Sequence, residues 1–244
     1  MQARFLAKAE TAESGPIVKF ECDECQDLQW VNGKPCACQT RKRQRRLFAE
    51  LVRNLGAIYA PHSLESLQPQ LSRHWKQAQL IEAMRAQPEA SWAFFGEKGI
   101  GKTLFAFVLA RHAIERGRFV VAVRLRTLLE QLREWEFNNG ARPAIVASTL
   151  REAETSWCIV LDEIGAISPT PYAGQELLDI VDAIYTSGRH QLIVTAMSDE
   201  ESLRQHYERA GDGLGGAILR RILDSPNVIK PRDLFELKAP LRVA

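Results

Sequence analysis

An eight-residue run, GEKGIGKT from Gly96 to Thr103, constrains the fold of this chain more than any other feature. It fits the pattern G-x-x-x-x-G-K-[ST] in full, between the apolar stretches SWAFF and LFAFVLARHAI. Its glycines let the backbone curl tightly, so that N–H groups point at phosphate oxygens. The positive end of a following helix adds to that attraction. A strand, a phosphate loop and a helix in this order predict a nucleotide-binding α/β domain.

We assign the whole loop to nucleotide binding. Lys102 is expected to reach the β- and γ-phosphates of ATP and to act in catalysis, and Thr103 to offer its hydroxyl to Mg²⁺. The alternative is a chance glycine-rich turn, for which the flanking strand and helix would be a coincidence. The assigned residues are Gly96, Glu97, Lys98, Gly99, Ile100, Gly101, Lys102 and Thr103.

A second acidic element is expected beside such a loop, and CIVLDE, from Cys158 to Glu163, supplies it at the end of an apolar run. Asp162 would hold Mg²⁺ through water. Glu163 would position and polarise the attacking water. The alternative is that two acids cap a strand in solvent. Cys158 is most simply a small buried core residue.

Two further segments offer groups for the γ-phosphate. QLIVTAMSD carries Thr195 and Ser198, either of which would bond the water or the phosphate, unless the segment is an ordinary strand end. GGAILRRILDSP carries Arg220 and Arg221 on a predicted helix. One of these arginines would reach the γ-phosphate of a neighbouring subunit, unless both belong to a solvated basic face.

From about residue 75 onward, continuously apolar runs alternate with runs that are apolar at helical spacing. This alternation predicts a parallel sheet with helices on both faces. We therefore expect an α/β P-loop core at 75–244, a linker at 56–74 and a small N-terminal domain at 1–55. A helix is predicted over 41–56, ending at Gly56.

Four of the five cysteines lie close together, with the spacing Cys22-x2-Cys25-x10-Cys36-x-Cys38. Four thiolates in two short knuckles suit tetrahedral Zn²⁺, which would supply much of the folding energy of so small a domain. Reduced, unligated cysteines or a redox pair are the alternatives. The segment Gln39 to Arg53 that follows has six basic residues against Glu50. It would contact a phosphate backbone, or serve as a solvated or protein-docking face.

Composition adds few constraints. The net charge is +2, which does not indicate a nucleic-acid partner. No apolar run approaches the roughly 20 residues of a membrane-spanning helix. The N-terminus, MQARFLAKAETAESG, lacks an apolar secretory core. We therefore expect a cytoplasmic protein.

Arg124 and Arg126 are either DNA-contacting residues or exposed charges at a strand end.

The order of these segments resembles the DnaC/DnaI-type replicative helicase loaders, AAA+ ATPases of the IstB/DnaC-like superfamily that include phage-borne members. The resemblance rests on CDEC…CAC, the basic helix, LGAIYAPHSLESL, GEKGIGKT, CIVLDEIGA, IVDAIYTSGRHQLIVTAMSDEESLRQ and GGAILRRIL, over roughly residues 20–225. It implies an AAA+ core without a full lid, and ATP-bound subunits that assemble as a spiral or ring segment. It also implies a zinc-stabilised domain that grips the hexameric helicase, and contact with single-stranded DNA.

Residue by residue, the resemblance makes Lys102 and Thr103 the Walker A pair and Asp162 and Glu163 the Walker B pair. Arg221 matches the arginine finger. Ser198 stands at the sensor position, where the family usually has asparagine. The arginine often found before that strand is absent, with Ile184 and Tyr185 near its place. The implied ATPase is slow and stimulated by its partner, with ATP, Mg²⁺ and Zn²⁺ as cofactors.

Three functions follow as hypotheses. The first is a loader of the hexameric replicative helicase onto single-stranded DNA. The second is an IstB-type regulator that coats duplex DNA and recruits a transposase, a reading that the zinc knuckles disfavour. The third is a non-hydrolysing adaptor whose loop only senses ATP, against which the intact Lys102, Asp162 and Glu163 argue.

Overall fold

The computed structural model describes residues 21–67, 75–138, 143, 157–196, 199–224 and 228–229. The chain divides into two compact units, Met1–Lys42 and Arg43–Ala244. From the sequence we predict a boundary at residue 55, whereas this division falls inside one helix. The second half of that helix belongs to the second unit because its side chains Leu47, Leu51 and Leu55 are buried in the core of that unit.

The first unit is built around a short antiparallel hairpin of β1 (Trp30–Val31) and β2 (Lys34–Pro35). Asn32 and Gly33 turn the chain with positive φ angles of 51° and 74°. An Asn-Gly pair suits a two-residue turn because both of its central residues need this conformation. Helix α1 (Ala37–Leu55) follows directly, so the helix predicted over 41–56 exists and begins earlier.

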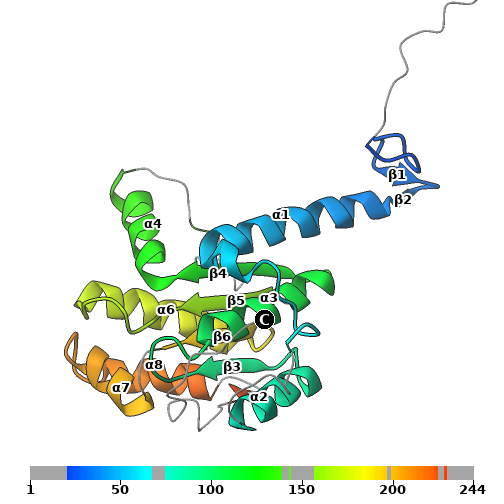
Figure 1. Ribbon diagram of the computed structural model, residues 1–244. Coiled ribbons are helices and arrows are strands. Elements are labelled where there is room, and N and C mark those ends of the chain that lie inside the picture. The colour runs from blue at the N-terminus through cyan, green and yellow to red at the C-terminus, as the bar shows by residue number, and fades with distance from the viewer. Residues whose placement is uncertain are drawn as a thin grey trace, which may run out of the picture. The chain divides into compact units, whose positions relative to one another are not determined.

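A five-stranded parallel sheet forms the centre of the second unit (Figure 1). Its order is β4-β5-β6-β3-β7, so β6 lies between the strand before the phosphate loop and the strand that carries the acidic pair. All neighbouring strands are parallel, and their carboxyl ends therefore meet at one edge. The strands are β3 (Ser91–Phe94), β4 (Phe119–Arg124), β5 (Trp157–Asp162), β6 (Gln191–Thr195) and β7 (Val228–Ile229).

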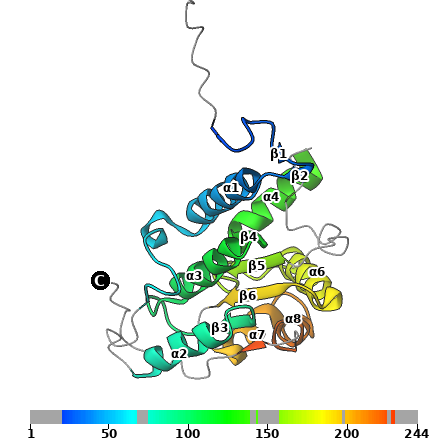
Figure 2. The same ribbon diagram turned by 90° about the vertical axis from the view of Figure 1, so that its right-hand side faces the viewer.

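Helices cover both faces of this sheet, as predicted (Figures 1 and 2). Alternate strand residues divide between two cores: Trp92 and Phe94 pack with α1, α2 and α3, whereas Ala93 and Phe95 pack with α4, α6, α7 and α8. This is the alternation of side chains expected along a strand. The helices are α2 (Trp75–Ala86), α3 (Lys102–Glu115), α4 (Leu125–Asn138), α6 (Pro171–Ser187), α7 (Glu200–Glu208) and α8 (Leu214–Leu223).

The sequence pattern misses the shortest elements. The hairpin β1–β2, the 3₁₀ turn η1 (Ala57–Tyr59) and β7 are two or three residues long, too short for any periodicity. Helix α7 has a local signal, because Asp199 accepts a hydrogen bond from the Ser202 N–H as its N-cap.

Among the described residues, no helix is both long and apolar enough to cross a membrane. The expected absence of a full lid stays a prediction, since residues 230–244 lie outside the described part.

Candidate functional site

The phosphate loop connects β3 to α3 in the conformation that its glycines permit. Gly96, Gly99 and Gly101 have φ angles of 139°, 89° and 95°. Gly101 stands as the N-cap of α3, so the first N–H groups of a 14-residue helix point at the loop. Lys102 Nζ donates to the carbonyls of Gly96 at 2.8 Å and Glu97 at 2.7 Å, which ties the lysine across the loop. Burial lowers the pKa of Lys102, against the pull of Asp162 and Glu163.

Asp162 ends β5 as a fully buried carboxylate beside the loop. Its Oδ1 accepts from Thr103 Oγ1 at 3.0 Å and from Thr195 Oγ1 at 2.6 Å. Its Oδ2 is buried without a hydrogen-bond partner among the described residues, and lies 3.7 Å from Arg124 Nε. Burial raises the pKa of Asp162, although the two hydroxyl hydrogen bonds oppose that rise.

These donors fit Mg²⁺. A buried carboxylate oxygen that lacks a hydrogen bond is costly unless a cation or water satisfies it, and Mg²⁺ prefers carboxylate and hydroxyl oxygens. Thr103 and Asp162 would hold the ion. Its chemistry there would be to neutralise charge on the β- and γ-phosphates.

Glu163 follows Asp162 in a left-handed backbone conformation with a φ angle of 60°. This conformation is uncommon for a residue with a side chain, and two hydrogen bonds hold it. The Glu163 N–H donates to Thr195 Oγ1 at 2.9 Å, and the Ile164 N–H donates to the Thr195 carbonyl at 3.0 Å. The side chain of Glu163 is exposed at the carboxyl edge of the sheet, the position that a group acting on water requires.

Thr195 is the polar residue of β6 that the structure brings into the site. From the sequence we expect Thr195 or Ser198 here, and the family resemblance implies Ser198 at the sensor position. Ser198 lies outside the described residues. The signal for Thr195 is its place as the last residue of β6, the strand between β3 and β5. The carboxyl end of that strand faces the loop and the acidic pair together.

The two arginines of α8 differ in their surroundings. Arg221 Nε contacts Asp182 Oδ1 of α6 at 2.5 Å, and its guanidinium lies 4.9 Å from the centre of the Tyr185 ring. Arg220 is exposed. Both of these contacts join Arg221 to α6 of its own chain.

The four clustered cysteines form a second candidate centre, in the first unit. Their sulfur atoms all lie within 4.8 Å of one another, with Cys22–Cys36 at 3.8 Å and Cys25–Cys38 at 3.5 Å. Sulfurs bound to one tetrahedral Zn²⁺ at about 2.3 Å stand about 3.8 Å apart. All four are buried and none is in a disulfide, so the donor set fits zinc.

The four packed thiols shift one another's acidity. Burial, with hydrogen bonds from the other thiols, raises the pKa of Cys38 to about 12. The backbone N–H of Cys25 leads the contacts that lower the pKa of Cys22 to about 7. Four packed thiols resist joint ionisation, and a bound metal removes that resistance because it takes the thiolate form.

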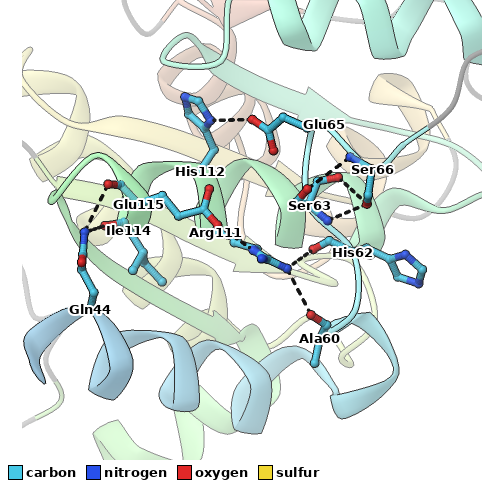
Figure 3. A network of polar contacts seen from close by, with 10 residues as sticks. All are labelled: Gln44, Ala60, His62, Ser63, Glu65, Ser66, Arg111, His112, Ile114 and Glu115. Carbon is cyan, nitrogen blue, oxygen red and sulfur yellow. Dashed lines mark hydrogen bonds and ion pairs between the residues drawn. The ribbon is translucent and has the colours of Figure 1, made fainter. Parts of the chain in front are cut away.

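The linker and α1 attach to α3, the helix that follows the loop (Figure 3). Arg111 donates to the carbonyls of Ala60 at 3.2 Å and His62 at 2.9 Å. Gln44 of α1 donates to the carbonyls of Ile114 at 3.0 Å and Glu115 at 3.1 Å. Helix α1 and the start of the linker therefore contact the helix that follows the phosphate loop.

Part of the basic segment has structural contacts. Lys42 pairs with Glu21 at 2.7 Å, and Arg43 donates to the Gly117 carbonyl at 3.2 Å and lies over the Phe119 ring. Arg41 and Arg45 are exposed. Contact of this segment with a phosphate backbone stays a prediction.

Solved structures share this fold. A crystal structure of DnaI superposes with a TM-score of 0.56 at 17% identity, covering 77% of this chain and 96% of that chain. A crystal structure of the DnaC helicase loader superposes with a TM-score of 0.50 at 17% identity, covering 70% of this chain and 97% of that chain. Identities this low support the fold alone.

A known protein and a protein family also match this chain by sequence. The nitric oxide reductase transcription regulator NorR1 of Cupriavidus necator is 39% identical over 77 residues, 30% of this chain. The chain spans 15% of that regulator and about half of the DnaA chains it resembles. Residues 39–233 match the family described as IstB-like ATP binding protein. With its phosphate loop and acidic strand end in place, this chain belongs to the IstB-like ATP binding proteins.

Proposed function

We propose that this chain is an ATPase that loads a hexameric replicative helicase onto single-stranded DNA at the initiation of replication. The observation that carries the proposal is the buried four-cysteine centre, which stands directly before an IstB/DnaC-like ATP-binding core. The family match begins at residue 39, so it covers none of the four cysteines. Such a centre suits a docking module attached to the core, because zinc stabilises a unit too small to have its own apolar core.

ATP hydrolysis would follow from the residues at the carboxyl edge of the sheet. The loop N–H groups and Lys102 would bind the phosphates, while Thr103 and Asp162 would hold the metal. The exposed carboxylate of Glu163 orients a water molecule and accepts its proton. The Thr195 hydroxyl holds both acids in place. The helicase-binding segment that we expect at residues 1–55 belongs to the same proposal.

Arg221 would complete the site in trans. It contacts Asp182 and Tyr185 of α6 in its own chain, and we propose that it serves the γ-phosphate of a second copy. Assembly of ATP-bound copies into a ring segment or spiral would bring it there. This assembly makes turnover depend on protein concentration.

The first unit offers an apolar surface for the helicase. Leu28 and Trp30 are 75% and 56% exposed in this small unit. Exposed tryptophan is a frequent energetic anchor of protein interfaces. We expect the pair to contact an apolar patch on the helicase.

Co-elution with the replicative helicase tests the proposal. The full chain is mixed with the purified helicase, with and without ATP, and the complex is followed by size-exclusion chromatography. Nucleotide-dependent co-elution that is lost in the Leu28→Ser, Trp30→Ser variant supports loading. Absence of a complex in both states, with one zinc bound per chain, refutes it.

The family match favours one alternative, an IstB-type ATPase that regulates transposition on duplex DNA. The discriminating measurement is ATP-dependent binding to single-stranded and duplex DNA of equal length. Filaments on duplex DNA, without helicase binding, would establish this alternative.

A further inference from the structure

Two side chains join the turn after α1 to the residues that would hold Mg²⁺. Arg124 Nη2 donates to the carbonyl of Leu55, the last residue of α1, at 2.9 Å. Nε of the same guanidinium lies 3.7 Å from Asp162 Oδ2. Arg124 and Asp162 are also register partners at the ends of β4 and β5. One guanidinium therefore spans the buried carboxylate and the carbonyl end of a helix, where a cation is favourable.

Tyr59 makes a parallel connection four residues later. Its ring packs on Phe107 of α3, with the ring centres 5.9 Å apart. Burial and Asp162 raise the pKa of Tyr59, and the nearby Thr103 side chain opposes that rise. Leu55 and Tyr59 thus lie at the two ends of a short turn. Arg124 connects Leu55 to Asp162, and Tyr59 lies near Thr103, so each end of the turn is close to one of the two proposed metal-binding side chains.

The chain on either side of this turn is held independently. Before it, Asn54 Nδ2 donates to the Ala122 carbonyl of β4 at 2.9 Å. After it, Arg111 holds the carbonyls of Ala60 and His62 (Figure 3). A change at the metal-side residues would therefore act on residues 55–59 rather than on the whole linker.

We infer that Arg124 and Tyr59 are positioning residues. They couple the binding of Mg²⁺–nucleotide at Thr103 and Asp162 to the stability of the last turn of α1. The inference rests on the nucleotide site of the proposed function and is independent of helicase loading. A divalent cation at Asp162 would remove the attraction between Asp162 and Arg124 and would repel the guanidinium, so Arg124 would shift and its contact with the Leu55 carbonyl would weaken. The coupling is reciprocal, and a partner that shifts α1 alters the affinity for Mg²⁺–nucleotide by the same factor.

Hydrogen exchange of the full chain over residues 52–60 tests this coupling. Here the Gly56 N–H bonds the Val52 carbonyl at 2.9 Å and the Tyr59 N–H bonds the Gly56 carbonyl at 3.2 Å. The protein is first dialysed free of Mg²⁺ and then saturated with a non-hydrolysable ATP analogue. Mg²⁺ is added last. A chelator is avoided because it would remove zinc. We expect Mg²⁺ to raise exchange on the order of 5-fold over this segment.

Three variants complete the design. In Arg124→Gln, residues 52–60 should exchange fast before Mg²⁺ is added, and Mg²⁺ should raise their exchange rate by less than about two-fold. Tyr59→Phe keeps the ring on Phe107, and it should also raise the exchange rate of residues 52–60 before Mg²⁺ is added. Arg209→Gln removes an equal charge from an exposed position after α7 and should behave as the natural chain.

Analogue occupancy is measured for each variant by fluorescence. If Arg124→Gln fails to bind the analogue, Tyr59→Phe decides the test. No response of residues 52–60 to Mg²⁺ in the natural chain overturns the inference, and so does an undiminished response in both variants. A chain that shows the response but does not bind helicase retains this inference and loses the loader proposal.

Discussion

One hydroxyl sets the geometry of the acidic pair. Thr195 Oγ1 donates to Asp162 Oδ1 and accepts the N–H of Glu163. The first bond fixes the carboxylate of a fully buried side chain, and the second satisfies the N–H of a residue in a left-handed conformation. A site that orders metal and water depends on such a bond, because each acid is otherwise free to take other rotamers.

Replacing Thr195 by Val keeps the shape of the side chain and removes its hydroxyl. The Glu163 N–H and Asp162 Oδ1 then each lose a partner, which should lower the free energy of unfolding by about 1–3 kcal/mol. Mg²⁺-dependent nucleotide affinity should fall with it. Thr195→Ser keeps the hydroxyl and serves as the control. Urea denaturation and nucleotide titration measure both effects, and equal behaviour of the Val and Ser variants would contradict the assignment.

Replacing Glu163 by Gln separates binding from hydrolysis. The side chain is exposed and has no assigned contact with the phosphates, so ATP should bind as before. Turnover should fall by about 10²–10⁴-fold, because the amide cannot accept the proton of water. Lys102→Ala is the contrasting variant, and should lose binding as well as turnover. Full turnover in Glu163→Gln would refute its role, and natural protein that binds ATP without turning it over would favour the sensing adaptor.

At the scale of elements, close packing of α7 against α8 positions the helix that carries Arg221. Gly215 is buried where the two helices meet, and a Cβ on it would lie 2.0 Å from the Arg204 carbonyl oxygen. Gly216, one residue later, would place its Cβ 3.7 Å from Glu208 Oε1, which is ordinary contact. Only the first glycine is required by the approach of the two backbones.

Gly215→Ala should therefore lower the free energy of unfolding by about 1–3 kcal/mol, because backbone atoms must separate to admit the methyl group. Gly216→Ala is the matched control in the same helix, where alanine should be neutral or stabilise by up to about 1 kcal/mol. Thermal denaturation of both variants measures the difference. Equal stability would show that α7 and α8 separate at little cost.

At the scale of the whole molecule, the two compact units have different sources of stability. The second has two apolar cores, one on each face of its sheet. The cluster in the first consists of four cysteines with Val31 packed against them. A unit without a large apolar core depends on its metal, so the two units should respond differently to metal removal.

We expect about one zinc per chain, and its removal by a chelator under reducing conditions should unfold residues 21–42 alone. Limited proteolysis should then cut in this segment, while nucleotide affinity stays within about two-fold, because the nucleotide site belongs to the other unit. Cys36→Ser should reproduce the effect without chelator. Persistent protection of residues 21–42 in both experiments would argue against a metal centre.

The sequence by itself determined the elements whose signals are local. The phosphate loop, the acidic pair, the apolar strands and the long helices follow from contiguous residues, because glycine conformation and hydrophobic periodicity act over a few turns. The cysteine spacing likewise determined the candidate zinc ligands.

Only the tertiary structure decided what depends on strand order and on contacts between distant segments. With β6 between β3 and β5, Thr195 bonds Asp162, which lies 33 residues away in the chain. Arg124 contacts the Leu55 carbonyl across 69 residues, and Arg221 pairs with Asp182 across 39. Hydrogen bonds and ion pairs act over a few ångströms, so such partners are determined only once the sheet has assembled.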